Sequence, residues 1–331
     1  MLSVLNKINL ALNRLIPVTT PAAVALGLIF PFIFIRLRPL VILLFGIMTF
    51  SGALKLTARE LGNTIKSPVP IILFFITSHV IMPLAAFASS SLIIPNQDII
   101  AGFVLLFAGP TAVSGFIWVM IFKGDKALSL TFILLDTILA PVVVPATLSV
   151  IIGESISMDM SGIAVSLIFM VVVPTIIAVS INEFSKGKIP GTICPFIEPF
   201  AKICLILVIA ANSSVIAPDI NLNDPVFWIA AALCIVLTVV GFLLAKLNGV
   251  IGKRAFKLTG AVNDSGSGEK ATSLIIAGGL RNNSAVMTIA VTFFPEAAVI
   301  PTLLSIIFQQ IITAIMGKVL IKKNEVFQKH I

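Results

Sequence analysis

The chain has 331 residues, of which 58% are hydrophobic and 11% are charged, and its mean hydropathy is +1.15. A soluble globular domain carries charge on about 25% of its residues, so this composition excludes that class and indicates a polytopic membrane protein. The net charge of +8 comes from basic residues scattered among short loops, which fits membrane topology and does not suggest nucleic-acid binding.

Ten apolar segments approach or exceed the ~20 residues that a helix needs to cross a bilayer. In chain order, we expect them at residues 18–35, 39–57, 68–91, 98–122, 127–151, 160–182, 198–216, 225–246, 270–292 and 297–320. Residues 1–17 precede them as an expected interfacial amphipathic segment, since their leucines and isoleucines fall on one helical face. Residues 321–331 are expected to form a cytoplasmic tail.

Basic residues alternate between the loops. Eighteen of the 22 fall at the N-terminus, at the C-terminus or in the even-numbered loops. Lys202 lies just inside the seventh segment and can snorkel to the same side, whereas Arg36 and Arg38 in the first loop depart from the pattern. The positive-inside rule therefore predicts a multi-pass protein of the plasma (inner) membrane with both termini in the cytoplasm.

Residues 18–151 and residues 152–320 each hold five segments, so two similar halves would have opposite orientations. That is the inverted-repeat design of many secondary transporters. The internal similarity is weak, but Ala108-Gly109-Pro110 in the fourth segment corresponds in place to Ala277-Gly278-Gly279 in the ninth. We therefore expect two inverted five-helix repeats.

Helix-breaking residues interrupt both of these segments, at Gly109 and Pro110 and again at Gly278 and Gly279. Unwinding there gives half-helices whose N-termini present free N–H groups to an anion. The residues at and beside the breaks that could bind a substrate are Gly109, Pro110, Thr111, Ser114, Gly278, Gly279, Arg281, Asn282 and Asn283, and Ser284 adds another hydrogen-bonding side chain. A proline kink or a small-residue packing site is the alternative explanation, and the pairing of the breaks favours a binding site.

Two full charges lie deep in the segments, Asp136 in the fifth and Arg281 in the ninth. Both lie roughly 15–17 Å into a ~30 Å core, which makes a direct ion pair plausible. Such a pair serves binding or coupling, or it only holds two helices together.

The other candidates for a coupling ion or a charge pair are Ser78, His79, Ser129 and Gln309. His79 is either a proton relay or, as is commoner, a buried histidine bonded to a neighbouring helix. The sequence has no P-loop, no HExxH and no nucleophile–base–carboxylate set, so it predicts neither an enzyme nor an ATPase subunit as partner.

The segment from Ala101 to Pro145 resembles the fourth and fifth helices of the bile acid:sodium symporter family. The motifs that carry the resemblance are Lys-Gly-Asp at 123–125, Ala-Leu-Ser at 127–129, Leu-Ala-Pro at 139–141, Met-Pro at 82–83 and Gly-Leu-Arg-Asn-Asn at 279–283. The resemblance covers nearly the whole chain. It implies an all-α fold of ten transmembrane helices with a panel (first, second, sixth and seventh) and a core in which the broken fourth and ninth helices cross. It also implies organic anions as substrates and sodium ions beside the crossing.

The chain departs from that family at the expected sodium ligands. The family's Ser-Asn pair falls on Val113-Ser114 or Ser114-Gly115, and its third-helix Gln falls on Ser78. Its ninth-helix Glu and Gln fall on Ala277 and Arg281, so that only Ser129 and Asn282 remain.

A guanidinium at ~4 Å repels a cation by several kcal/mol at an intermediate dielectric. We therefore hypothesise that Arg281 replaces one sodium ion, with Asp136 or the substrate as counter-ion. Alternatively, Asp136 supports a relocated cation site or takes a proton.

Together these features predict a secondary active transporter that moves a small organic anion by alternating access, in contact with membrane lipids. No cofactor is expected, and the coupling ion is sodium, a proton or neither. The alternatives are an uncoupled uniporter or channel for organic acids, and a membrane protein that binds a ligand without moving it.

Overall fold

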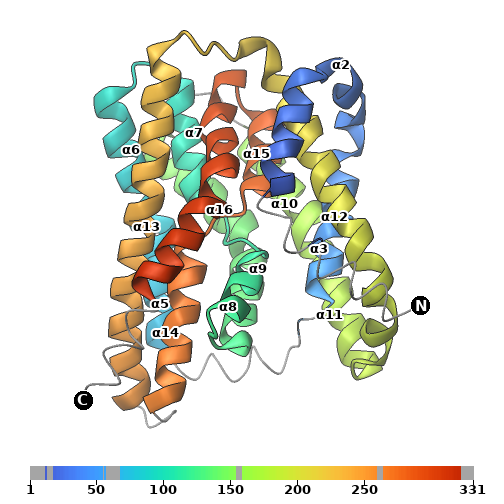
Figure 1. Ribbon diagram of the computed structural model, residues 1–331, viewed down its shortest axis with the longest axis vertical. Helices are drawn as coiled ribbons and strands as arrows, with labels where there is room; N and C mark the ends of the chain where they lie inside the picture. Colours follow the sequence, from blue (N-terminus) through green and yellow to red (C-terminus); the bar gives the residue numbers. More distant parts are fainter. Residues whose placement is uncertain are drawn as a thin grey trace.

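A computed structural model describes Leu12 and residues 18–54, 56, 68–153, 159–258 and 264–321, in which every regular element is a helix (Figure 1). Eight segments of it are long and apolar enough to cross a membrane, namely Pro31–Ala53, Pro68–Ile93, Lys126–Ile151, Met160–Ser185, Lys188–Ile216, Pro225–Arg254, Gly266–Phe293 and Glu296–Leu320. Two apolar helices are shorter, Val18–Ile29 and Gln97–Ala108. The protein is therefore an all-α, multi-pass membrane protein. The segments predicted for residues 1–17 (Leu12 apart) and beyond residue 321 lie outside the described residues.

The elements follow one another without any strand among the described residues. After the helix Val18–Ile29 come α2 (Pro31–Phe34), the 3₁₀-helix η1 (Ile35–Leu40), α3 (Val41–Ala53), α5 (Pro68–Ile76), the π-helix η2 (Thr77–Ile81), α6 (Met82–Ile93), α7 (Gln97–Ala108), α8 (Gly115–Ile121), α9 (Lys126–Ile151), α10 (Met160–Leu167), the π-helix η4 (Ile168–Val172), α11 (Val173–Ser185), α12 (Lys188–Ile216), the 3₁₀-helix η5 (Ala217–Asp219), α13 (Pro225–Leu258), α14 (Asp264–Gly279), α15 (Asn283–Phe293), the 3₁₀-helix η6 (Glu296–Val299) and α16 (Ile300–Leu320).

Two of the ten predicted segments are shorter than a full span. The first helix ends at Ile29, before the predicted end at residue 35, where the chain bends at Phe30. Pro31 follows and has no N–H with which to continue the helical ladder. The fourth segment is divided because residues 109–114 leave the helix between α7 and α8. The seventh begins at Lys188, earlier than the predicted residue 198.

Figure 1 shows two groups of helices side by side. One contains α5, α13, α14 and α16, and the other contains α3, α11 and α12, with α8 and α9 between them in this view. Within the groups, α13 packs against α5, α14 and α16, while α12 packs against α3 and α11. This division creates an interface at which a site can lie between two packed bodies.

Two side-chain hydrogen bonds join α15 to α12 and to η1. The Asn212 amide on α12 donates to Thr288 Oγ1 on α15 at 2.9 Å. The Arg38 guanidinium on η1 donates to the carbonyl of Val291 at 3.1 Å, in the last turn of α15. A cation at a helix C-terminus stabilises the unpaired carbonyls there. This contact gives Arg38 a local reason to depart from the charge pattern of the other loops.

The basic turns gather at one end of the bundle. In Figure 1 the connection from α8 to α9, the connection from α11 to α12 and the adjoining ends of α13 and α14 all lie at the lower end, opposite α2. These positions carry Lys123, Lys186, Lys253 and Arg254. Their common side agrees with the loop pattern of the sequence, and the cytoplasmic location of that side stays a prediction.

A π-helical turn precedes Pro83 on the third segment. Within it the Met82 N–H bonds to the carbonyl of Thr77, five residues back. Pro83 has no N–H to bond the His79 carbonyl, and its ring clashes with an ordinary helical turn. Thr147 Oγ1 on α9 donates to that free carbonyl at 3.3 Å. The widened turn therefore fixes where the imidazole of His79 points.

Candidate functional site

Both predicted helix breaks are present, and they differ in register. The α7 helix ends at Ala108, and Gly109 is extended, with ψ 153°, as expected before Pro110. In the second break, α14 continues through Gly278 and Gly279 and ends there, so that residues 280–282 leave the helix. The second break is thus slightly later than its glycines suggested.

Hydrogen bonds tie the two breaks to each other. The Asn282 N–H donates to the carbonyl of Pro110 at 2.8 Å. Thr111 Oγ1 donates to the carbonyl of Ala277 at 2.7 Å and also lies 3.2 Å from the carbonyl of Leu280. These bonds satisfy backbone groups that the broken helices leave free, which the membrane interior requires. The breaks therefore meet at one place, and each supplies partners to the other.

The glycines at the breaks allow close packing rather than an unusual backbone angle. None of Gly109, Gly278 and Gly279 has a positive φ. A Cβ on Gly109 would collide with Val286, and a Cβ on Gly279 would collide with the ring of Phe242. One on Gly278 would come within 2.8 Å of Ala245 Cβ. These residues were predicted to bind substrate, and the structure gives them a packing role.

Asp136 is fully buried and bonds to His79 and to the first break. Its Oδ1 lies 2.7 Å from His79 Nε2, and its Oδ2 accepts the Thr111 N–H at 2.7 Å. The other imidazole nitrogen, Nδ1, lies 3.2 Å from the carbonyl of Ala108. The direct ion pair suggested between Asp136 and Arg281 is therefore wrong. Arg281 feels the charge of Asp136 at longer range, and His79 takes the direct contact.

Arg281 is held by its backbone while its side chain faces a cavity. The Gln309 amide bonds it twice, since Arg281 N donates to Gln309 Oε1 at 3.1 Å and Gln309 Nε2 donates to Arg281 O at 2.9 Å. The guanidinium Nη1 donates to the carbonyl of Leu280 at 3.2 Å. Only 3% of the residue is exposed, and the guanidinium Nε is buried without a hydrogen-bond partner in the protein. A buried donor of this kind favours an anionic ligand.

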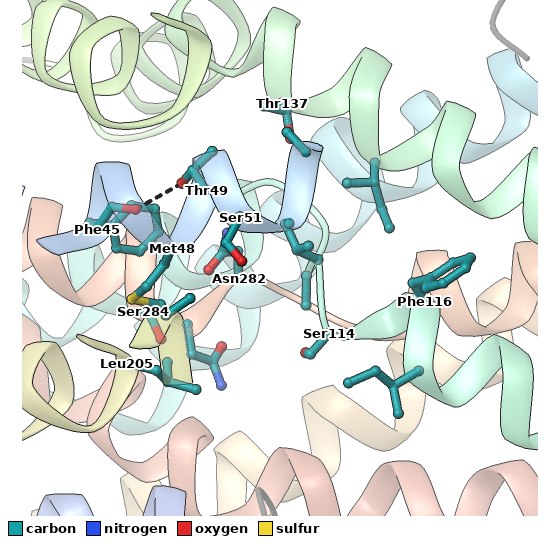
Figure 2. A pocket seen from close by; sticks show the side chains of 18 of the residues that line it. Phe45, Met48, Thr49, Ser51, Ser114, Phe116, Thr137, Leu205, Asn282 and Ser284 are labelled. Carbon is teal, nitrogen blue, oxygen red and sulfur yellow. Dashed lines mark hydrogen bonds between the residues drawn. The ribbon is translucent and has the colours of Figure 1, made fainter. Parts of the chain in front are cut away.

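A cavity of about 260 Å³ separates the breaks from α3 and α12. Figure 2 shows Ser114, Asn282 and Ser284 from the breaks facing Thr49 and Ser51 on α3, with Phe116 at one side. Apolar side chains complete the wall, among them Phe45, Met48, Leu205 and Ile306. The cavity thus combines a polar centre with apolar walls, as small-molecule sites commonly do.

The predicted site residues divide between this cavity and the contacts behind it. Those that line the cavity are Ser114, Arg281, Asn282, Asn283 and Gln309. Thr111, Asp136 and His79 are buried and bonded to each other or to the breaks, outside the lining. Ser78 is buried with an unpartnered hydroxyl, and Ser129 is buried on α9. Asn282 also caps α15, since its side chain accepts the Ala285 N–H at 3.2 Å.

Several polar residues of the lining were missed by reading the sequence. They are Thr20, Thr49, Ser51, Thr137, Thr175, Glu198 and Lys202. Glu198 and Lys202 lie four residues apart on α12, a spacing that puts both on one helical face. Two opposite charges on one face of an otherwise apolar helix were an available signal. Lys202 had instead been interpreted as a snorkelling residue.

Comparison with known proteins relates this chain to one family and to several bacterial and plant proteins. Residues 41–219 match the sodium bile acid symporter family. Over 305 residues the chain is 34% identical to the uncharacterized protein YbaS of Bacillus subtilis, covering 92% of this chain and 96% of that protein. It is 26% identical over 164 residues to the uncharacterized sodium-dependent transporter YocS of the same organism, covering 50% of this chain and 51% of that protein.

A plant relative matches over a shorter share of its length. The chain is 28% identical over 203 residues to the probable sodium/metabolite cotransporter BASS3, chloroplastic, of Oryza sativa subsp. japonica, covering 61% of this chain and 48% of that protein. The paired helix breaks, the cavity beside them and these matches lead to one conclusion: the chain belongs to the sodium bile acid symporter family, whose members are membrane transporters and not enzymes.

Proposed function

We propose that the protein is a secondary active transporter that moves a small organic anion across the cell membrane by alternating access. The observation that carries this proposal is Arg281, a buried cation on the cavity wall whose Nε has no protein partner. A guanidinium in such surroundings needs a counter-charge or hydrogen-bond acceptors, and a carboxylate, sulfate or sulfonate supplies both.

The cavity also favours a small substrate. Its volume of about 260 Å³ lies just below the range of roughly 300–1,000 Å³ that is usual for drug-sized ligands. Lys202 adds a second basic residue to the wall, while Glu198 adds an acidic one. Asn282, Asn283 and Ser284 contribute hydrogen-bonding groups beside Arg281. We expect an anion held at Arg281, with its apolar part against α3 and α12.

The proposal includes ten transmembrane helices in two inverted repeats, residues 18–151 and 152–320. Paired breaks in α7–α8 and α14–α15 support this symmetry, as do the hydrogen bonds between them. The panel would consist of the first helix, α3, α11 and α12, and it would rock against a core that contains both breaks. The cavity lies between these two parts, where alternating-access transporters bind their substrates.

We infer further that the sodium sites of the family are degraded in this chain. Sodium requires several oxygen ligands, and three side-chain oxygens at the crossing already bond to protein groups. Both oxygens of Asp136 are taken by His79 and Thr111, and Asn282 Oδ1 is taken by the Ala285 N–H. Arg281 adds positive charge beside them. These side chains do not fit a sodium ion, and this supports reduced or absent sodium coupling.

The test begins with thermal-shift measurements on the purified protein, using a panel of small carboxylates, sulfates and sulfonates. Compounds that stabilise it are then assayed as radiolabelled substrates in proteoliposomes, with and without a sodium gradient. Arg281→Gln should abolish stabilisation and uptake, while Arg36→Gln, the same change at an exposed position, should leave both intact.

Each possible result has a distinct meaning. Flux that never exceeds equilibration would identify a uniporter or channel. Stabilisation without flux would identify a ligand-binding protein that does not transport. A strict requirement for sodium would contradict the degraded sodium sites and leave anion transport intact.

A further inference from the structure

The imidazole of His79 lies between two hydrogen-bond acceptors. Nδ1 lies 3.2 Å from the Ala108 carbonyl and Nε2 lies 2.7 Å from Asp136 Oδ1. A carbonyl can only accept, so the bond at Ala108 requires a hydrogen on Nδ1. The bond at Asp136 then needs a second hydrogen, carried either by Nε2 or by the carboxyl group. Both arrangements place one more proton on the pair than a neutral histidine and a carboxylate hold.

The structure therefore assigns a proton-binding site to the His79–Asp136 pair. Resting on the proposed function, we propose that this proton is transported together with the organic anion. Both residues are buried, with His79 5% and Asp136 0% exposed. An isolated charge is costly to bury, and the extra proton leaves the pair with zero net charge.

Loss of the proton would change the first helix break. The remaining hydrogen would stay on Nε2, where it bonds to the carboxylate, and Nδ1 would turn a lone pair toward the Ala108 carbonyl. That contact would be repulsive, so the bond to the end of α7 would be lost. Asp136 would still accept the Thr111 N–H, and the strain would fall between Ala108 and Thr111. These residues flank Gly109 and Pro110, which separate the two half-helices.

Loss of the proton would also alter the charge near the substrate. Among the described residues, Arg281 at the second break is a charged group that interacts with Asp136. The contacts made with η2 by Phe74 and Phe75 on α5 and by Asn248 on α13 are neutral, the first two with the His79 ring and the third with Thr77 Oγ1. A protonated pair leaves the charge of Arg281 to the substrate, whereas an anionic pair competes for it. Proton and anion should therefore bind cooperatively, and each should raise the affinity for the other by the same factor.

The balance of charge follows directly. One proton and one monoanion bind on one side of the membrane, and both leave on the other. The pair then returns without its proton, and Arg281 is compensated by the anionic pair. A complete cycle moves no net charge. The driving force for a monoanion would be its own gradient and the pH gradient, with no need for sodium.

The chain offers an unusually direct measurement, because His79 and His330 are its only histidines. In a His330→Gln background, ¹⁵N-histidine labelling makes His79 the single labelled ring in lipid nanodiscs. Nitrogen NMR should show hydrogen on Nδ1 while the pair holds its extra proton, and loss of that hydrogen from Nδ1 once the pair has released the proton at higher pH. Asp136→Asn should abolish this titration. A ring that stays in the neutral Nε2–H form throughout would overturn the proposal.

A second measurement links the proton to transport. In sodium-free proteoliposomes, an inward acid gradient should drive accumulation of a stabilising monocarboxylate or sulfonate from the thermal-shift panel. Apparent Kd should rise by about tenfold per pH unit above the midpoint of the titration, the slope for one linked proton. His79→Gln and Asp136→Asn should remove this pH dependence, while Asp224→Asn, at an exposed position, should keep it.

The two measurements separate the two proposals. Anion uptake that is indifferent to pH in the wild-type protein would overturn proton coupling and leave the proposed function standing. Absence of any uptake together with a normal His79 titration would overturn transport and leave the proton site standing. Should Asp136→Asn fail to fold, the wild-type titration and His79→Gln still decide the question.

Discussion

Replacing Gln309 should destabilise the protein more than replacing its neighbour Gln310. Gln309 is 3% exposed, and its amide makes both hydrogen bonds to the backbone of Arg281. Gln309→Met removes these bonds at nearly constant volume. The Arg281 carbonyl keeps a bond from the Asn283 N–H at 2.9 Å, so the Arg281 N–H is the group left without a partner. An orphaned buried donor costs about 1–3 kcal/mol.

Gln310 provides the matched control. Its side chain accepts the Trp118 Nε1–H at 2.9 Å in a partly buried position, where water can replace it. Gln310→Met should therefore cost only about 0.5–1.5 kcal/mol, the usual net value of one hydrogen bond. Thermal unfolding followed by circular dichroism in detergent micelles should give a lower midpoint for Gln309→Met than for Gln310→Met.

The same pair of variants tests whether Gln309 positions Arg281. Affinity for the anion should fall in Gln309→Met, because the guanidinium loses its fixed backbone. Equal midpoints for the two variants, or a Gln309→Met protein as stable as wild type, would refute the view that this amide holds the second break.

Two further substitutions test packing and capping. Gly279→Ala places a methyl group against the ring of Phe242 and should cost about 1–3 kcal/mol, while Gly268→Ala on the same helix meets nothing within 4 Å and should be neutral or stabilising in thermal melts. The opposite order would contradict the close packing of α13 on α14. Hydrogen bonds, chiefly from the Gly162 N–H, lower the pKa of Asp159 from its ordinary value of 3.8. Because its pKa is lower in the folded state, the Asp159 carboxylate stabilises the fold at pH values above 3.8, and this stabilisation is lost as the pH falls through the folded pKa. The difference in melting temperature between wild type and Asp159→Ala should therefore be present at pH 7 and become smaller in acid. A difference that grows in acid would exclude this cap.

Much of the architecture could be predicted from residue order. Apolar length identified the helical segments, and Pro110 with its neighbouring glycine located the first break, because proline offers no N–H to the helical ladder and favours an extended backbone in the residue before it. The predicted position of the second break was less accurate. Gly278 and Gly279 suit close packing as well as unwinding, and α14 uses them for packing against α13. Sequence alone does not separate these two uses of glycine.

The contacts of the buried charges could not be predicted in the same way. Counting residues along a helix gives depth in the membrane, and at equal depth Asp136 and Arg281 seemed suited to pair. Depth says nothing about rotation around the helix axis. The π-helical turn before Pro83 aims His79 at Asp136, and a widened turn of this kind has no clear sequence signal. The cavity wall on α12 was missed for another reason, since Lys202 near the start of the seventh predicted segment was interpreted as a snorkelling charge and Glu198 was not considered.

The bonds from Asn212 to Thr288 and from Arg38 to Val291 have a kinetic consequence. They connect α15 to α12 and to η1, and none of their four residues lines the cavity. Any motion that separates α15 from α12 and η1 must break both before new partners form. The free energy needed to break these two hydrogen bonds therefore contributes to the activation barrier for exchange between conformations. Weakening either one should change how often the protein turns over while leaving the affinity of the cavity almost untouched.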